Sequence, residues 1–120
     1  MNASDPRFVP DGLPRVWVSR HAADRIREHH PHAGVNGCRA LLAIASPVQP
    51  EVVAGLLGRS LEGVRDRYLV AADRRGVFVV AAYSEATRPG SDALPETLVT
   101  YVRLSPSQVE AAVRLWPVEP

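Results

Sequence analysis

The sequence has 120 residues, of which 46% are hydrophobic and 22% are charged, and its formal net charge is +1. These values are typical of one folded domain and exclude a disordered chain. No apolar run approaches the roughly 20 residues of a membrane-spanning helix, so we expect no membrane association. The single cysteine excludes an internal disulfide and a cysteine-rich zinc site. Since the N-terminal residues also lack the pattern of a secretory signal, the sequence favours the cytoplasm.

The first third of the chain predicts an irregular arm, a strand and a helix. Residues 1–14 contain three prolines and a glycine and form the predicted arm, which precedes a single domain at residues 15–117. Residues 15–19 are rich in strand formers. Ser19 is a suitable helix N-cap, and the helix after it is expected to reach about His30, because Pro31 discourages its continuation.

Residues 32–63 are predicted to form a helical insertion. Its two apolar segments, residues 38–45 and 50–58, are each long enough for a short helix, and Gly58 lies where a helix C-cap is expected. Ser46 and Pro47 between the segments are interpreted as a break. The apolar character of the first segment suggests that Cys38 is a buried free thiol.

Strand formers dominate the second half of the chain. Asp73 and Gly76 have the positions that these residue types favour in a hairpin turn. Residues 84–96 are polar and contain two prolines and a glycine, so they predict a loop. Residues 105–108 (SPSQ) have the pattern of a capping box and start a helix that ends before Pro117. The expected strands are residues 65–72, 77–83 and 97–104.

The resulting element order is β-α-α-α-β-β-β-α, which predicts an α+β fold. Strands that are linked by a hairpin pair in an antiparallel sheet, and helices cover such a sheet to bury its apolar side. We therefore expect a small antiparallel sheet of about four strands, with the helices packed mainly on one face.

His21 and Arg25 are the first candidates for a functional site. They lie four residues apart in a predicted helix, so their side chains share one helix face. Imidazole is the usual general acid or base near neutral pH, and guanidinium binds phosphate bidentately and stabilises developing negative charge. RNA cleavage by attack of the 2′-hydroxyl needs both functions. The alternative is a solvated helix face, in which Asp24 and Glu28 pair with the arginines.

Arg67 and Thr100 are the second pair of candidates, because each lies on a predicted strand. An arginine and a hydroxyl on a sheet beside the histidine-bearing helix are able to line an RNA cleft. Both are equally compatible with ordinary outward-facing strand residues.

His29, His30 and His32 form a cluster around Pro31. Imidazole suits zinc, copper or nickel, but neighbouring histidines on a helix diverge by about 100° and no HExxH motif or cysteine pair completes a site. We therefore predict no metal and no cofactor. A surface cluster, assistance in acid–base chemistry and weak metal binding remain as interpretations of these histidines.

Several short motifs resemble those of RelE/ParE-like domains in the barnase–EndoU–colicin–RelE (BECR) grouping of small ribonuclease toxins. The S/T-x-H-A-x-x-R helix motif occurs as residues 19–25. The R-Y-L/V strand motif occurs as residues 67–69, followed by the turn glycine Gly76. The closing V-V/I-T-x-Y/L strand motif corresponds to residues 98–102. The resemblance spans residues 16–104 of the chain.

This resemblance implies a helix packed on an antiparallel sheet and, in many relatives, RNA cleavage without a metal. It implies that His21 is the acid–base residue, that Arg25 and Arg67 bind phosphate, and that Thr100 donates a hydrogen bond. RNA or the ribosome would be the target, and an antitoxin or another protein would be a partner.

The sequence thus predicts a toxin-like, metal-independent endoribonuclease. The alternative is a non-catalytic protein-binding module on a RelE-like fold, which contacts its partner through the sheet or the apolar residues 38–58. The net charge of +1 favours this alternative, because nucleic-acid-binding domains usually have a strong basic excess.

Overall fold

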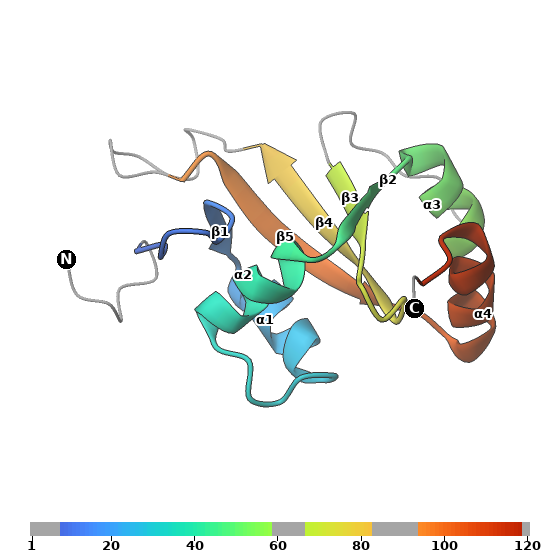
Figure 1. The fold of residues 1–120 in the computed structure, drawn as a ribbon, viewed down its shortest axis with the longest axis horizontal. Helices are drawn as coiled ribbons and strands as arrows, with labels where there is room; N and C mark the ends of the chain where they lie inside the picture. The colour runs from blue at the N-terminus through green and yellow to red at the C-terminus, as the bar shows by residue number, and fades with distance from the viewer. Residues whose placement is uncertain (1–7, 59–66, 83–93, 119–120) are drawn as a thin grey trace.

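The computed structural model describes residues 8–58, 67–82 and 94–118. Within them, a five-stranded sheet carries four helices (Figure 1). The strands are β1 (Val16–Val18), β2 (Ser46–Val48), β3 (Arg67–Val70), β4 (Gly76–Ala82) and β5 (Glu96–Arg103), and the helices are α1 (Arg20–Arg27), α2 (Val35–Ala43), α3 (Pro50–Leu57) and α4 (Pro106–Leu115).

Some predictions concern segments outside this part of the chain. They are the last residues of the predicted helical insertion, most of the polar loop at residues 84–96, the first half of the N-terminal arm and the outer ends of two predicted strands. No helix in the described segments is both long and apolar enough to cross a membrane.

The α+β fold class is confirmed, although the sheet has one strand more than expected and is mixed. Its order is β1-β5-β4-β3-β2, with β1 parallel to β5 and the other neighbours antiparallel. The extra strand is β2, which the sequence indicated as a break between two helices. Pro47 cannot donate a backbone hydrogen bond, but β2 is an edge strand, where a proline is tolerated.

Helices cover both faces of the sheet, whereas the sequence predicted that they pack mainly on one. The first core cluster joins α1 and α2 to strand residues such as Phe78 and Leu98. The second joins α3 and α4 to Tyr68 and Val77. Because successive strand residues point to opposite faces, the unbroken apolar runs of β3 and β4 supply both clusters.

The start of α1 is fixed to β5 through Ser19. As predicted, Ser19 is the N-cap: its Oγ accepts a hydrogen bond from the Ala22 amide at 3.0 Å. The same hydroxyl donates to the Val99 carbonyl at 2.9 Å. Val99 lies at a bulge in β5, where the register with β4 shifts. The helix therefore lies directly across β5, at a position that its cap and the bulge determine together.

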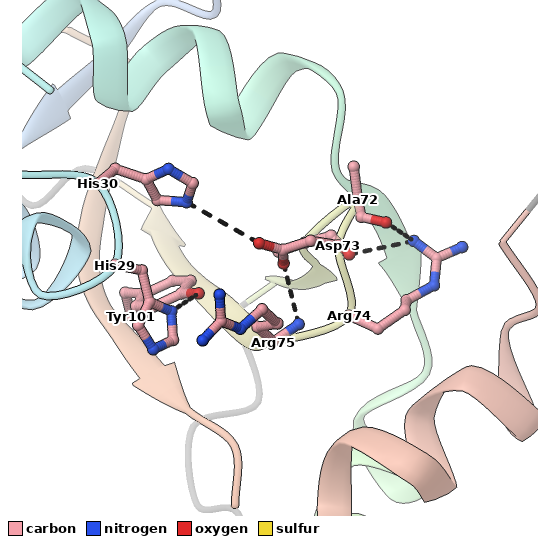
Figure 2. A network of polar contacts seen from close by, with 8 residues as sticks. His29, His30, Ala72, Asp73, Arg74, Arg75 and Tyr101 are labelled. Carbon is pink, nitrogen blue, oxygen red and sulfur yellow. Dashed lines mark hydrogen bonds and ion pairs between the residues drawn. The ribbon is translucent and has the colours of Figure 1, made fainter. Parts of the chain in front are cut away.

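The helix α1 ends at Arg27, three residues before the predicted end. Beyond it, the amides of His29 and His30 both donate to the Ile26 carbonyl, at 3.0 and 2.9 Å. This short turn lies close to the end of β5 and to the β3–β4 turn (Figure 2). The early end of α1 thus brings the histidine cluster to the sheet.

The β3–β4 turn has the predicted chemistry, since the Asp73 carboxylate accepts a hydrogen bond from the Arg75 amide at 2.9 Å. Arg74 between them has a positive φ of 62°. The capping box at the start of α4 is also confirmed: Ser105 accepts from the Gln108 amide, and the Gln108 side chain accepts from the Ser105 amide. These two features fix the two loops that border the candidate site.

Candidate functional site

An open groove of about 940 Å³ lies where the end of α1, the β3–β4 turn and the start of α4 come together. Glu28 and His29 line it from the end of α1, Arg75 from the turn and Arg103 from the end of β5. The other lining residues are 104–106, 108 and 109, which include part of the first turn of α4. Four polar side chains from three distant segments therefore converge on one concave surface.

His29 is the titratable group at the centre of these side chains. Its Nδ1 lies 3.0 Å from the hydroxyl of Tyr101, and the two rings meet edge to face with their centroids 5.7 Å apart (Figure 2). Burial lowers the pKa of His29 below its ordinary value, and the positive charges of Arg75 and Arg103 lower it further. The imidazole is therefore neutral at neutral pH and is able to accept a proton.

Tyr101 is buried, and its contact with Nδ1 orients the His29 ring. Burial raises the pKa of its hydroxyl to about 12, with a smaller contribution from Asp73, so the group stays protonated at physiological pH. The Phe78 ring packs against it at a centroid distance of 5.0 Å. On its other side lies Gly76, where a Cβ atom would be 2.0 Å from Cζ of Tyr101. Only glycine at position 76 leaves room for this ring.

Two arginines, Arg75 and Arg103, line the groove together with His29. Arg103 pairs with Glu28 at 3.6 Å, and Glu28 pairs with Arg25 at 3.5 Å, so one carboxylate orients two guanidiniums. Arg75 extends from the turn and is exposed. Arginine binds phosphate oxygens in a planar, bidentate geometry. The groove thus combines a neutral imidazole with two arginines at its edge.

Two of the four sequence-predicted site residues, His21 and Arg25, lie on α1, whose end borders the groove, but neither lines it. His21 is exposed on α1, one turn before Arg25. Arg25 reaches the edge of the groove only through the shared Glu28. The structure therefore places the predicted helix face beside the groove.

The other two predicted residues lie elsewhere. Arg67 donates to both carboxylate oxygens of Glu96, at 2.7 and 2.8 Å. Glu96 and Arg103 are the two ends of β5, roughly 20 Å apart at the usual rise of a strand. Thr100 pairs with Val79, which packs against the second core cluster, so Thr100 points to the face opposite α1. The four predicted residues do not form one site.

The sequence contained part of the signal for the observed site. Tyr101 and Arg103 are two residues apart in a predicted strand, so they share a face, and His29 belongs to the histidine cluster. Nothing local in the sequence indicates that Arg75 joins them, because that depends on how the β3–β4 turn lies relative to β5. The register between β4 and β5 also brings Gly76 against the Tyr101 ring, where only glycine leaves room for it.

Cys38 does not line the groove, and the described histidines do not form a metal site. Cys38 is buried, as predicted, and burial raises the pKa of its thiol, which disfavours the nucleophilic thiolate. In the described segments, no three His, Cys, Asp or Glu side chains are arranged to hold a metal ion together.

Comparison with known proteins does not assign the chain to a family. No family model matches it, and the searches of curated proteins and of solved structures found no significant match. The resemblance to RelE-like toxins therefore stays a prediction, and a function has to be argued from the groove itself.

Proposed function

We propose that this protein is a metal-independent endoribonuclease that cleaves RNA by attack of the 2′-hydroxyl on the adjacent phosphate. The observation that carries the proposal is a neutral histidine, oriented by a buried tyrosine, in an open groove that two arginines also line. This arrangement supplies a base for the hydroxyl proton and cations for the phosphate. The reaction is the one predicted from the sequence, but its residues differ from the predicted set.

His29 is the proposed general base. When its Nδ1–H donates to the Tyr101 hydroxyl, Nε2 carries a lone pair that is able to take the proton of the 2′-hydroxyl. Tyr101 is a positioning residue, because it is buried and acts through His29. Its high pKa keeps it uncharged, so the pair does not attract a second proton to the imidazole.

Arg75 and Arg103 are the proposed phosphate ligands. As the 2′-oxygen forms its bond to phosphorus, negative charge grows on the non-bridging oxygens, and two guanidiniums stabilise it. The bond from phosphorus to the 5′-oxygen then breaks, and the departing oxygen takes a proton from water in the open groove; the hydroxide formed takes the proton from His29 afterwards, which restores both water and the base. The net products are a 2′,3′-cyclic phosphate and a free 5′-hydroxyl.

Cleavage of a mixed-sequence RNA in EDTA, with the protein and two matched variants, tests this proposal. His29→Asn keeps a polar group near the position of Nδ1 but removes the base, so we expect the cleavage rate to fall about 10²–10⁴-fold. His21→Asn is the matched control, because His21 is exposed on α1 and does not line the groove, and this variant should cleave at the parental rate. Circular dichroism of both variants checks that they remain folded.

The outcomes separate the proposals. Loss of cleavage in His21→Asn with normal cleavage in His29→Asn would support the sequence-derived site and overturn ours. If the parent protein does not cleave free RNA, the assay is repeated with mRNA bound to bacterial ribosomes. The ribosome is the other target that the sequence predicted. Failure on both substrates would contradict the ribonuclease proposal.

One observation favours the alternative of a protein-binding module. A second hollow of about 440 Å³ lies between α3 and α4, and Val52 and Leu115 beside it are 37% and 50% exposed. Exposed apolar side chains that cluster in a hollow are typical of protein contacts. If both RNA substrates remain intact, the next measurement is the binding of candidate partner proteins to the parent protein and to Leu115→Glu.

A further inference from the structure

A pocket smaller than the groove lies beside His29, and it is distinct from the hollow between α3 and α4. We propose that this pocket is a base-binding subsite that prefers cytosine to uracil. This inference rests on the proposed ribonuclease function, because it assigns a nucleobase to the pocket. It goes beyond that function by naming the feature of the RNA that the protein reads.

The pocket has a volume of about 200 Å³ and lies between the end of α2 and the β3–β4 turn. Leu41 and Ile44 of the α2 side and Ala72 of the turn form apolar walls, and the rings of Phe78 and Tyr101 line it from the sheet. Pockets for drug-sized ligands are larger than this, so its size suits a single flat ring. Ile44 is 63% exposed, which is unusual for isoleucine and leaves apolar surface for a ligand to cover.

Two polar groups line this otherwise apolar pocket. Nε2 of His30 and Oδ2 of Asp73 face each other at 4.0 Å (Figure 2). This distance is longer than a hydrogen bond, so both groups keep hydrogen-bonding capacity toward a ligand. The other oxygen of Asp73 already accepts from the Arg75 amide, which holds the carboxylate in place.

The chemistry of this pair matches the edge of cytosine. The carboxylate accepts a hydrogen bond from the exocyclic amino group, as Asp and Glu do when they read cytosine in nucleic acids. His30 is able to donate to the neighbouring ring nitrogen of the base. Uracil has a carbonyl oxygen where cytosine has the amino group, so two acceptors would face each other at Asp73.

The position of the pocket connects base recognition with cleavage. Tyr101 lines the pocket, and its hydrogen-bond partner His29 lines the groove. Arg75 lines the groove and lies two residues after Asp73, whose carboxylate accepts its amide hydrogen bond. A base in the pocket would therefore place the attached phosphate near the two arginines.

The test uses the dinucleotides dCpdC and dUpdU, which lack the 2′-hydroxyl and therefore bind without being cleaved. Binding to the parent protein is followed by NMR through the methyl signals of Ile44 and Leu41. We expect dCpdC to bind about tenfold more tightly than dUpdU, as for one hydrogen bond to a charged acceptor, and to shift the Ile44 methyl signal.

Two variants identify the groups responsible. Asp73→Asn keeps an oxygen for the Arg75 amide but removes the charge, and it should bring the ratio of the two affinities close to one. Arg103→Gln lies in the groove outside the pocket, and it should weaken both dinucleotides by the same factor. Equal binding of the two dinucleotides by the parent, or no methyl shift with dCpdC, would overturn the subsite.

Cleavage of two RNA oligonucleotides that differ only by cytosine or uracil separates this inference from the proposed function. Cleavage of both at the same rate, together with equal dinucleotide binding, would leave the ribonuclease standing and reject the subsite. Discrimination in binding with no cleavage of any RNA would support the subsite and reject the ribonuclease.

Discussion

The protonation of His29 depends on groups from three separate parts of the chain. Burial and the positive charges of Arg75 and Arg103 all disfavour the imidazolium, while Asp73 favours it more weakly. In the unfolded chain these groups are distant, so the imidazole returns to its ordinary pKa of 6.5. The unfolded state therefore binds more protons between the lowered pKa and 6.5, and the folded protein loses stability as the pH falls through this window.

Removal of one of these charges should change both the pKa and the activity in a known direction. In Arg75→Gln, less repulsion acts on the imidazolium, so the pKa of His29 should rise. Since the base must be neutral, the acidic limb of the pH–rate profile should move to higher pH by the same amount. An NMR titration of the His29 ring proton measures the first effect, and RNA cleavage at a series of pH values measures the second.

Arg67→Gln is the control for that experiment, because its guanidinium is bound to Glu96 at the other end of β5. It should leave the pKa of His29 unchanged. An equal shift in both variants would mean that His29 responds to the total charge of the protein, and the specific role of Arg75 would be wrong.

At the scale of elements, a single arginine joins the β3–β4 turn to the end of α4. Arg74 is buried, and its guanidinium donates to the Trp116 and Pro117 carbonyls at 2.7 and 3.3 Å. It also donates to the Ala71 and Ala72 carbonyls of its own turn, at 3.0 and 3.2 Å. Carbonyls at the end of a helix lack partners within the helix, so a cation there is favourable.

A matched pair of substitutions tests this contact. Arg74→Met retains the length of the side chain but leaves the carbonyls without this donor, and it should lower the free energy of unfolding by about 2–3 kcal/mol. Arg75→Met changes the exposed neighbour and should alter stability by less than about 0.5 kcal/mol. Urea denaturation measures both values. Similar values for the two variants would show that the Arg74 contacts do not stabilise the fold.

The elements that could be predicted from the sequence are those with local signals. Ser19, the Asp73 turn and the capping box at Ser105 all have short-range chemistry, and each occurs where it was expected. The strand at Ser46–Val48 was missed because its pairing with β3 is a long-range contact that no local pattern indicates. The groove was not predicted for the same reason, since the way Arg75 and Tyr101 come together in it depends on the register between β4 and β5.

At the scale of the whole molecule, the charge balance limits how the protein is able to hold RNA. All of its 14 Lys and Arg residues are arginine, yet 13 acidic residues leave a net charge of +1. Several arginines are engaged within the protein: Arg39 is fully buried and donates to the Val16 carbonyl, and Arg67 is bound to Glu96. Binding should therefore depend on the few arginines of the groove, and not on a broad basic surface.

This expectation is measurable through the salt dependence of binding. Each phosphate neutralised on a single strand contributes about −0.7 to the slope of log K against log salt concentration, so Arg75 and Arg103 together predict a slope of about −1.4. A fluorescent deoxycytidine oligonucleotide, which is not cleaved, is suitable for the titration. Arg103→Gln should reduce the slope by about 0.7, whereas Arg67→Gln should leave it unchanged, because Arg67 lies outside the groove and is bound bidentately to Glu96 at the other end of β5. A parental slope steeper than about −4 would reveal a wide basic contact that the groove does not explain, and it would move the RNA-binding surface away from His29.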